Sequence, residues 1–223
     1  MSLDLVARRS LVRSRDTIPP IAGSRRIPFV ISSGLNMFIP MSLTPSNMVE
    51  LGSIAPDFSL PNPSTGKTVR RDDFSNADAL LVIFMCAHCP YVIHVKPELI
   101  RLGKEYSSRP VGIVGISAND PAQYPADAPP QLAKFSRDLP FPLLFDETQE
   151  VAKAYDAACT PDFFLFDQQR KLVYRGQLDD SRPGNGIPLS GKDLRAAIDA
   201  VLSGKPVSPN QRASIGCNIK WKK

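Results

Sequence analysis

The four residues Cys86-Ala87-His88-Cys89 constrain the fold of this chain more than any other feature. They follow an uninterrupted apolar run over residues 79–85, and a stretch with apolar side chains at helical spacing begins at Pro90. A short continuous apolar run is typical of a strand that is buried on both faces of a sheet. The sequence therefore predicts a central strand that delivers two cysteines to the start of a helix.

This placement has a chemical consequence for the two thiols. The unpaired N–H groups and the dipole at a helix N-terminus favour negative charge, so a thiol there ionises more readily. We expect Cys86 to be the exposed nucleophile and Cys89, one helical turn inside, to be the resolving thiol. An imidazole of His88 beside Cys86 would stabilise the thiolate further. The expected redox group is the Cys86–Cys89 disulfide itself, with no other cofactor and no metal.

Two other interpretations of the cysteines were weighed. Zinc bound by all four cysteines is one of them, but the chain has no second C-x-x-C and no histidine pair at ligand spacing. Two inert buried thiols are the other. The position directly after a central strand favours the redox interpretation. The four cysteines are Cys86, Cys89, Cys159 and Cys217.

Length and charge limit the classes of function. The chain has 223 residues, 43% of them hydrophobic, which is enough for one sizeable core. It contains no apolar run of about 18 residues, so we expect no membrane span. The net charge is +5, but residues 1–48 hold six arginines and two aspartates and so account for +4 of it. The remainder is nearly neutral, and we expect no nucleic-acid partner.

Cysteine use and the N-terminal segment bear on location. Four cysteines in a chain of this length do not make the dense disulfide framework of a small secreted protein, and we expect a cytoplasmic location. Residues 1–48 are rich in arginine and serine and lack clear periodicity. They are interpreted as a disordered extension, as residues upstream of a true start at Met41 or Met48, or as a targeting segment.

The order of expected elements indicates an α/β fold. Residues 55–70 suggest an N-terminal β-hairpin, and strands over 79–85 and 111–117 are each followed by a helix or a proline-rich loop. A second hairpin over 163–175 and a helix over 191–202 complete the order. We therefore predict a central mixed sheet flanked by helices over residues 49–204, and an irregular tail over 205–223.

Cys159-Thr160-Pro161, just before the expected strand at 162–166, completes a pattern that resembles the thioredoxin superfamily. The opening Ala55-Pro56-Asp57-Phe58-Ser59-Leu60 is similar to the start of its peroxiredoxin-like branch, the alkyl hydroperoxide reductase and thiol-specific antioxidant proteins. The resemblance implies a thioredoxin-like domain in which Pro161 is cis and lies against the dithiol. It also implies that Thr160 offers backbone atoms to a substrate strand.

The chain departs from these families at several positions. Met85 stands where thioredoxin has a tryptophan, and Leu80 stands where it has the buried acid that accepts a proton from the resolving thiol. Asp179 or Asp180 is a candidate replacement for that acid, with a solvated turn as the default interpretation. The peroxiredoxin motif P-x-x-x-T/S-x-x-C, aligned on Cys89, places Cys86 in the hydroxyl position.

Together these features predict a thiol–disulfide oxidoreductase that uses the dithiol Cys86–Cys89, with a disulfide substrate and an unidentified electron-donor protein. One alternative is a peroxiredoxin-like antioxidant peroxidase in which Cys89 reacts with peroxide. Another is a redox-inert thioredoxin-fold module that binds extended peptides beside Pro161. Cys159 is expected to be either a third redox thiol or a small buried residue. Cys217 is expected to be an uninvolved tail thiol, with an intermolecular disulfide as the alternative.

Overall fold

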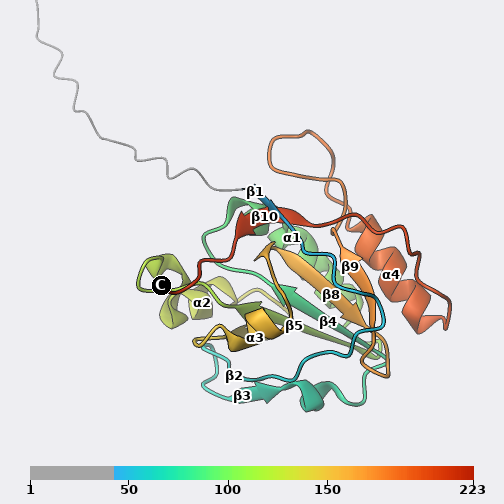
Figure 1. The fold of residues 1–223 in the computed structure, drawn as a ribbon, viewed down its shortest axis with the longest axis horizontal. Helices are drawn as coiled ribbons and strands as arrows, with labels where there is room; N and C mark the ends of the chain where they lie inside the picture. The colour runs from blue at the N-terminus through green and yellow to red at the C-terminus, as the bar shows by residue number, and fades with distance from the viewer. Residues whose placement is uncertain (1–42) are drawn as a thin grey trace, which may run out of the picture. The chain divides into compact units, whose positions relative to one another are not determined.

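A mixed five-stranded sheet forms the centre of the computed structural model, which describes residues 43–223 (Figure 1). Its strand order is β6-β5-β4-β8-β9. The first three strands run parallel to one another, and β8 and β9 are antiparallel to their neighbours. The strands are β4 (Ala79–Phe84), β5 (Val111–Ser117), β6 (Leu143–Phe145), β8 (Asp162–Phe166) and β9 (Leu172–Gly176).

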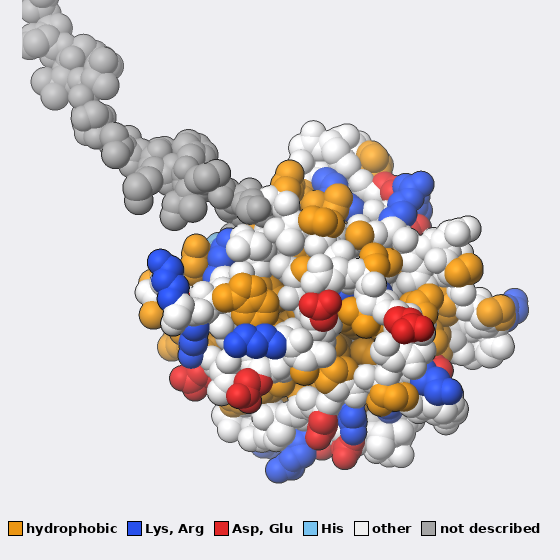
Figure 2. Space-filling view, in the orientation of Figure 1, with side chains coloured by type: hydrophobic (Ala, Val, Ile, Leu, Met, Phe, Trp, Pro, Cys, Tyr) orange, Lys and Arg blue, Asp and Glu red, His pale blue; other side chains and the backbone are white. Residues whose placement is uncertain are grey.

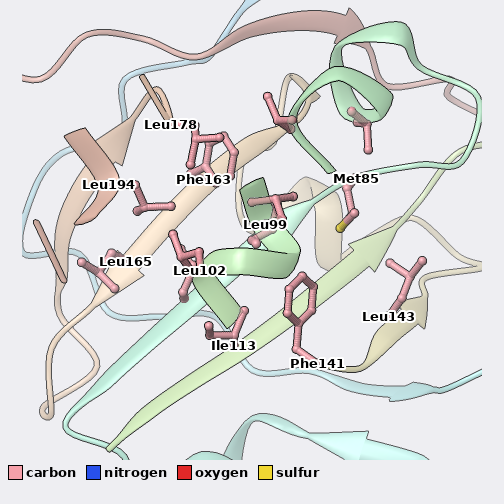
Figure 3. Packing of buried hydrophobic residues seen from close by; sticks show 14 of the residues in the cluster. Met85, Leu99, Leu102, Ile113, Phe141, Leu143, Phe163, Leu165, Leu178 and Leu194 are labelled. Atoms are coloured by element: carbon pink, nitrogen blue, oxygen red, sulfur yellow. The ribbon is translucent and has the colours of Figure 1, made fainter. Parts of the chain in front are cut away.

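Both faces of this sheet are covered, which explains the uninterrupted apolar run of β4. Leu81 and Ile83 pack into one hydrophobic cluster, whereas Leu80 and Val82 pack into another on the opposite face. Figure 3 shows the first cluster. Helices that contribute to this cluster are α1 (Pro90–Glu105), α2 (Pro129–Phe135) and α4 (Lys192–Leu202). The second cluster receives side chains from α3 (Glu150–Ala154) and from the hairpin of β2 (Ser59–Pro61) and β3 (Thr68–Arg70).

The thioredoxin-like architecture predicted from the sequence is therefore present, with smaller differences at the element ends. The N-terminal hairpin forms, but β2 begins at Ser59 rather than at residue 55. The chain also forms two short 3₁₀ helices, η1 (Arg71–Phe74) and η2 (Pro125–Asp127). The second of these lies within the predicted proline-rich loop, which the start of α2 shortens.

A second, small sheet corrects the predicted boundaries. Its order is β1-β10-β7, formed by β1 (Leu43–Pro45), β10 (Ile215–Asn218) and β7 (Cys159–Thr160). The prediction of an irregular tail over 205–223 was wrong, because the backbone of β10 pairs on both sides with strands distant in the sequence. Residues 43–48, predicted to belong to the N-terminal extension, begin with a strand of this sheet. The predictions for residues 1–42 lie outside the described residues.

The surface of the described residues carries charges of both signs. On the face shown in Figure 2, acidic and basic side chains are interspersed with apolar ones. This face therefore presents no continuous basic patch among the described residues that would follow a phosphate backbone. Within the same part of the chain, no helix has both the length and the apolar character needed to cross a membrane.

Candidate active site

The two cysteines of the C-x-x-C motif lie between the end of β4 and the start of α1. β4 ends at Phe84, and the next residue still bonds the sheet through the Met85 N–H and the Ile116 carbonyl, 2.9 Å apart. Helix α1 begins at Pro90, which suits the first helical position because that position needs no N–H donor. Cys89 is the N-cap residue of α1. It was expected one turn inside the helix, and that prediction was wrong.

Thr160 contacts both thiols of the motif. Its hydroxyl oxygen is 3.5 Å from the Cys86 sulfur, and its carbonyl oxygen is 3.2 Å from the Cys89 sulfur. The following Thr160–Pro161 peptide bond is cis, the isomer that the family resemblance implies. Cys86, Cys89 and Thr160 are all buried, so the prediction of an exposed Cys86 was wrong. The segment that ends in Thr160 therefore covers the dithiol in the reduced protein.

A third thiol, that of Cys217, contacts the sulfur of Cys89. Cys217 belongs to β10, and its sulfur is 2.6 Å from the Cys89 sulfur. Both side chains are buried, with exposed fractions of 2% and 0%. Cys217 therefore lies beside the dithiol and not in an irregular tail, as was expected. Cys217 lacked any local sequence signal, since only the pairing of β10 with β7 brings it to the dithiol.

Contacts among the three thiols favour ionisation at Cys89 over the other two. Hydrogen bonds from the Cys217 and Cys86 thiols lower the pKa of Cys89 far below its ordinary value, with further help from the Val92 N–H. The same contact with Cys89, together with burial, raises the pKa of Cys86, as does the charge of Asp127. The pKa of Cys217 is raised by its contact with Cys89 and by burial. Cys89, at the start of α1, is thus the thiol whose ionisation these contacts favour.

Asp127 is a functional residue that the sequence analysis missed. One carboxylate oxygen accepts hydrogen bonds from the backbone N–H groups of Ala87 (2.7 Å) and His88 (3.3 Å). The other oxygen is 2.5 Å from Nδ1 of His88 and accepts a bond from the Asn119 side chain at 2.7 Å. Asp127 is fully buried, and burial alone would raise its pKa. The bonds from His88 and Asn119 outweigh that effect and hold the pKa below its ordinary value.

This carboxylate also changes the expected role of His88. The imidazole was expected to act on Cys86, but its Nδ1 is bonded to Asp127 and its ring stacks on Tyr124, with centroids 5.2 Å apart. The Asp127 charge opposes ionisation of Cys86. The Nδ1 atom of His88 is therefore bonded to the same carboxylate whose charge acts on Cys86.

The two acids proposed from the sequence as proton acceptors lie elsewhere. Asp179 accepts hydrogen bonds from the backbone N–H groups of Ser181, Ser190 and Gly191, and so organises the loop that precedes α4. Asp180 pairs with exposed cationic side chains. Neither acid is bonded to the dithiol. The buried acid beside the C-x-x-C motif is Asp127, which lies in the loop after β5.

Cys159 is buried in different surroundings. Its sulfur is 3.6 Å from the Pro161 carbonyl oxygen. Burial raises its pKa, and the nearby charge of Asp162 raises it further. Asp162 forms a fully buried ion pair with Arg175 at 3.1 Å and is also bonded to Ser46. We call Ser46, Cys159, Asp162 and Arg175 the polar cluster. In these surroundings Cys159 fits a small buried residue, one of the two expected interpretations.

Three of these side chains have the spacing of metal ligands. Cys86, His88 and Asp127 each offer one ligand atom, and the three atoms lie within 4.8 Å of one another. A thiolate, an imidazole and a carboxylate form a donor set that Zn²⁺ accepts. A bound ion would have to replace the hydrogen bond between His88 and Asp127.

The sheet, the dithiol at the start of α1 and the cis bond at Pro161 define a redox protein of the thioredoxin superfamily. The chain belongs to the Redoxin family, whose family model matches residues 50–190. No curated protein matches the chain at a significant level.

Similar solved structures share this fold. An uncharacterized conserved protein from Geobacillus kaustophilus is 54% identical, with a TM-score of 0.80, over 82% of this chain and 97% of that chain. A hypothetical protein from Sinorhizobium meliloti 1021 is 45% identical, with a TM-score of 0.79, over 80% and 98% of the two chains. A thiol:disulfide interchange protein of the thioredoxin family from Chlorobium tepidum shares the fold at 18% identity, with a TM-score of 0.53, over 70% and 99%.

Proposed function

We propose that the protein is a thiol–disulfide oxidoreductase in which Cys86 and Cys89 alternate between a dithiol and a disulfide. The observation that carries this proposal is the pair of thiols at the start of α1, where Thr160 contacts both sulfur atoms beside the cis peptide bond at Pro161. A thiolate is the attacking species in thiol–disulfide exchange, and a second thiol in contact with it can resolve the mixed disulfide. Membership of the Redoxin family supports thiol-based redox chemistry.

The charge distribution supports a definite order of steps. The Cys89 thiolate attacks a disulfide substrate, one substrate sulfur leaves as a thiolate, and a mixed disulfide forms at Cys89. The Cys86 thiol then loses its proton and attacks the Cys89 sulfur, which releases the second substrate thiol and leaves the Cys86–Cys89 disulfide. The sequence alone favoured the opposite roles, with Cys86 attacking. The pKa shifts of the two thiols support Cys89 as the first nucleophile.

The same thiolate supports a second candidate, peroxidase activity. Attack of Cys89 on a peroxide gives a sulfenic acid at Cys89 and releases water or an alcohol. Condensation of that sulfenic acid with the Cys86 thiol gives the same disulfide and releases water. In either case an electron-donor protein must return the disulfide to the dithiol.

Stopped-flow oxidation of the reduced protein separates these candidates. Oxidised glutathione and hydrogen peroxide are compared as oxidants on the native chain and on the Cys86→Ser and Cys89→Ser variants. We expect Cys86→Ser to retain the first step with the disulfide, and Cys89→Ser to lose it. Retention of the fast step by Cys89→Ser and its loss in Cys86→Ser would instead restore the order favoured by the sequence.

Peroxide provides the second half of this test. A fast reaction of Cys86→Ser with hydrogen peroxide supports the peroxidase candidate. If neither oxidant produces any disulfide at Cys86 or Cys89 in the native chain, both enzyme proposals fail. The thioredoxin-fold binding module would then be the remaining interpretation.

A further inference from the structure

The contact between Cys89 and Cys217 is unused by the two-thiol reaction. The two sulfur atoms are 2.6 Å apart, and both side chains are buried. The Cys86 thiol interacts with the same Cys89 side chain, and Thr160 contacts both sulfur atoms. Cys89 is therefore flanked by two thiols, one from its own motif and one from a strand 128 residues further along the chain.

Backbone pairing with β7 holds strand β10 against the site. Cys217 is paired with Thr160, and Asn218 with Cys159, in the antiparallel register of β10 and β7. Gly216 permits this close approach, because a Cβ atom at that position would lie 2.0 Å from the Thr160 carbonyl oxygen. Only glycine fits here without displacement of the strand. Figure 1 shows β10 between β1 and the start of α1.

Further bonds hold β10 on both sides of Cys217. On one side, the buried Ser214 hydroxyl donates to the Pro161 carbonyl at 2.7 Å. On the other side, the Lys220 N–H donates to the Asn119 side chain at 2.8 Å. Asn119 in turn donates to Asp127, which holds the loop that carries Cys86. The strand is thus tied both to the cis peptide bond and to the loop of the C-x-x-C motif.

We propose that Cys217 is a second resolving thiol for Cys89, and this proposal rests on the oxidoreductase function proposed above. When Cys89 carries a mixed disulfide, the Cys217 thiol loses its proton and its sulfur attacks the Cys89 sulfur. The bond between Cys89 and the substrate sulfur breaks, and the substrate leaves as a thiolate that takes up the proton. The product is a Cys89–Cys217 disulfide and a free Cys86 thiol.

The same geometry allows the disulfide to pass between two partners. In a Cys86–Cys89 disulfide, attack of Cys217 on the Cys89 sulfur forms Cys89–Cys217 and releases Cys86 with the proton that Cys217 gave up. One S–S bond forms and one breaks, so this exchange needs no oxidant or reductant. Cys89 is the shared sulfur in both disulfides.

The test follows the mixed disulfide in variants that lack Cys86. Reduced Cys86→Ser and Cys86→Ser/Cys217→Ser proteins are treated with oxidised glutathione, quenched with acid at intervals, and mapped by peptide mass spectrometry. We expect Cys86→Ser to convert its Cys89–glutathione adduct into an intramolecular Cys89–Cys217 disulfide. Loss of Cys217 should extend the lifetime of that adduct by at least about a hundredfold, because the neighbouring thiol acts at high effective concentration. Equal lifetimes in the two variants would overturn the proposal.

A matched control separates the position of Cys217 from its mere presence. The Cys86→Ser/Gly216→Val variant keeps Cys89 and Cys217, but the valine side chain cannot fit against the Thr160 carbonyl. We expect the Cys89–glutathione adduct of this variant to persist as it does without Cys217. If this variant converted its Cys89–glutathione adduct as fast as Cys86→Ser does, the result would contradict the claim that the close contact of β10 with Thr160 positions Cys217. Circular dichroism of each variant checks that it is folded.

The native chain keeps the proposal testable if a variant fails to fold. Partial oxidation of the native protein should give a Cys89–Cys217 disulfide in a fraction of the molecules beside Cys86–Cys89, and its complete absence at every stage would overturn the proposal. The proposed function fails separately. If the native chain forms Cys89–Cys217 and never Cys86–Cys89, the two-thiol function is wrong while the role of Cys217 stands.

Discussion

Cys159 and Cys217 lie on neighbouring strands of one small sheet and are both buried, yet their surroundings differ sharply. Cys217 lies on the Cys89 thiolate, whereas Cys159 lies in the polar cluster with the Asp162–Arg175 ion pair. Burial raises the pKa of both thiols. Under the proposed function, a sulfur partner, and not burial, separates a redox thiol from a structural one in this fold. The two regions should therefore respond differently to substitution.

The largest difference is expected for the shared sulfur. Cys89→Ser should lower the rate of disulfide exchange by a factor of at least about 10³, because it removes the thiolate that both neighbouring thiols serve. Cys159→Ser is the matched control and should leave this rate unchanged. Stopped-flow kinetics with oxidised glutathione measure both rates. A comparable loss in the two variants would remove the distinction between the two regions.

Substitutions in the polar cluster should instead lower the free energy of unfolding. Arg175→Met leaves the fully buried Asp162 carboxylate without its cation, and should cost about 3–5 kcal/mol of unfolding free energy. Arg212→Ala, which removes an exposed pair with Asp180, should cost much less, because water and salt screen an exposed pair. Urea denaturation of the reduced proteins measures both values. Equal costs would show that the cluster is not a structural centre.

The pH dependence sharpens the comparison within the thiol group. Because hydrogen bonds from Cys217 and Cys86 lower the pKa of Cys89 to about 2, its thiolate should persist from neutral into acid solution. An ordinary thiol, with a pKa near 8.5, would be protonated over the same range. Ultraviolet thiolate absorbance of the native chain minus that of Cys89→Ser should therefore be flat between about pH 4 and pH 7.

The lowered pKa of Cys89 also makes the stability of the reduced protein depend on pH. A thiol whose pKa is lower in the folded state stabilises that state at pH values above its unfolded pKa. The contribution is lost as the pH falls toward the lowered folded pKa, so the reduced native protein should lose more stability on acidification than Cys89→Ser. A thiolate absorbance that titrates near the ordinary thiol pKa would contradict the charge assignment.

The smallest effect is expected for Cys159→Ala. The substitution removes one buried sulfur from the polar cluster and should cost about 1 kcal/mol, a modest value for a small buried side chain. The disulfides formed by Cys89 should be unchanged. Thermal unfolding and peptide mapping of the oxidised variant measure the two effects, and an altered disulfide map would return Cys159 to the redox group.

The central sheet was predictable because its signals are local. The run over residues 79–85 is apolar throughout since both faces of β4 are packed, and the helix after Pro90 shows its buried side at regular spacing. The dithiol followed from its position beside these elements, and the cis Thr160–Pro161 segment from the resemblance to the thioredoxin superfamily. Local patterns of this kind are independent of distant pairing.

The parts of the site that were missed depend on distant partners. β10 has only four residues, includes a glycine, and is stabilised by pairing with β1 and β7. Asp127 lies in a proline-rich loop with no periodicity, and its role appears only when the loop folds over the C-x-x-C motif. One signal was available, since Asn119 and the loop with Asp127 follow the carboxyl end of β5, next to the strand that carries the cysteines.

The central claim is that Cys89 is the shared redox sulfur, flanked by Cys86 and Cys217, and that Cys159 takes no part. Peptide mapping of the native chain during graded oxidation with oxidised glutathione tests it most directly. The account predicts that every intramolecular disulfide contains Cys89, joined to Cys86 or to Cys217, while Cys159 stays a free thiol throughout. An intramolecular disulfide that omits Cys89, or one that includes Cys159, would contradict it.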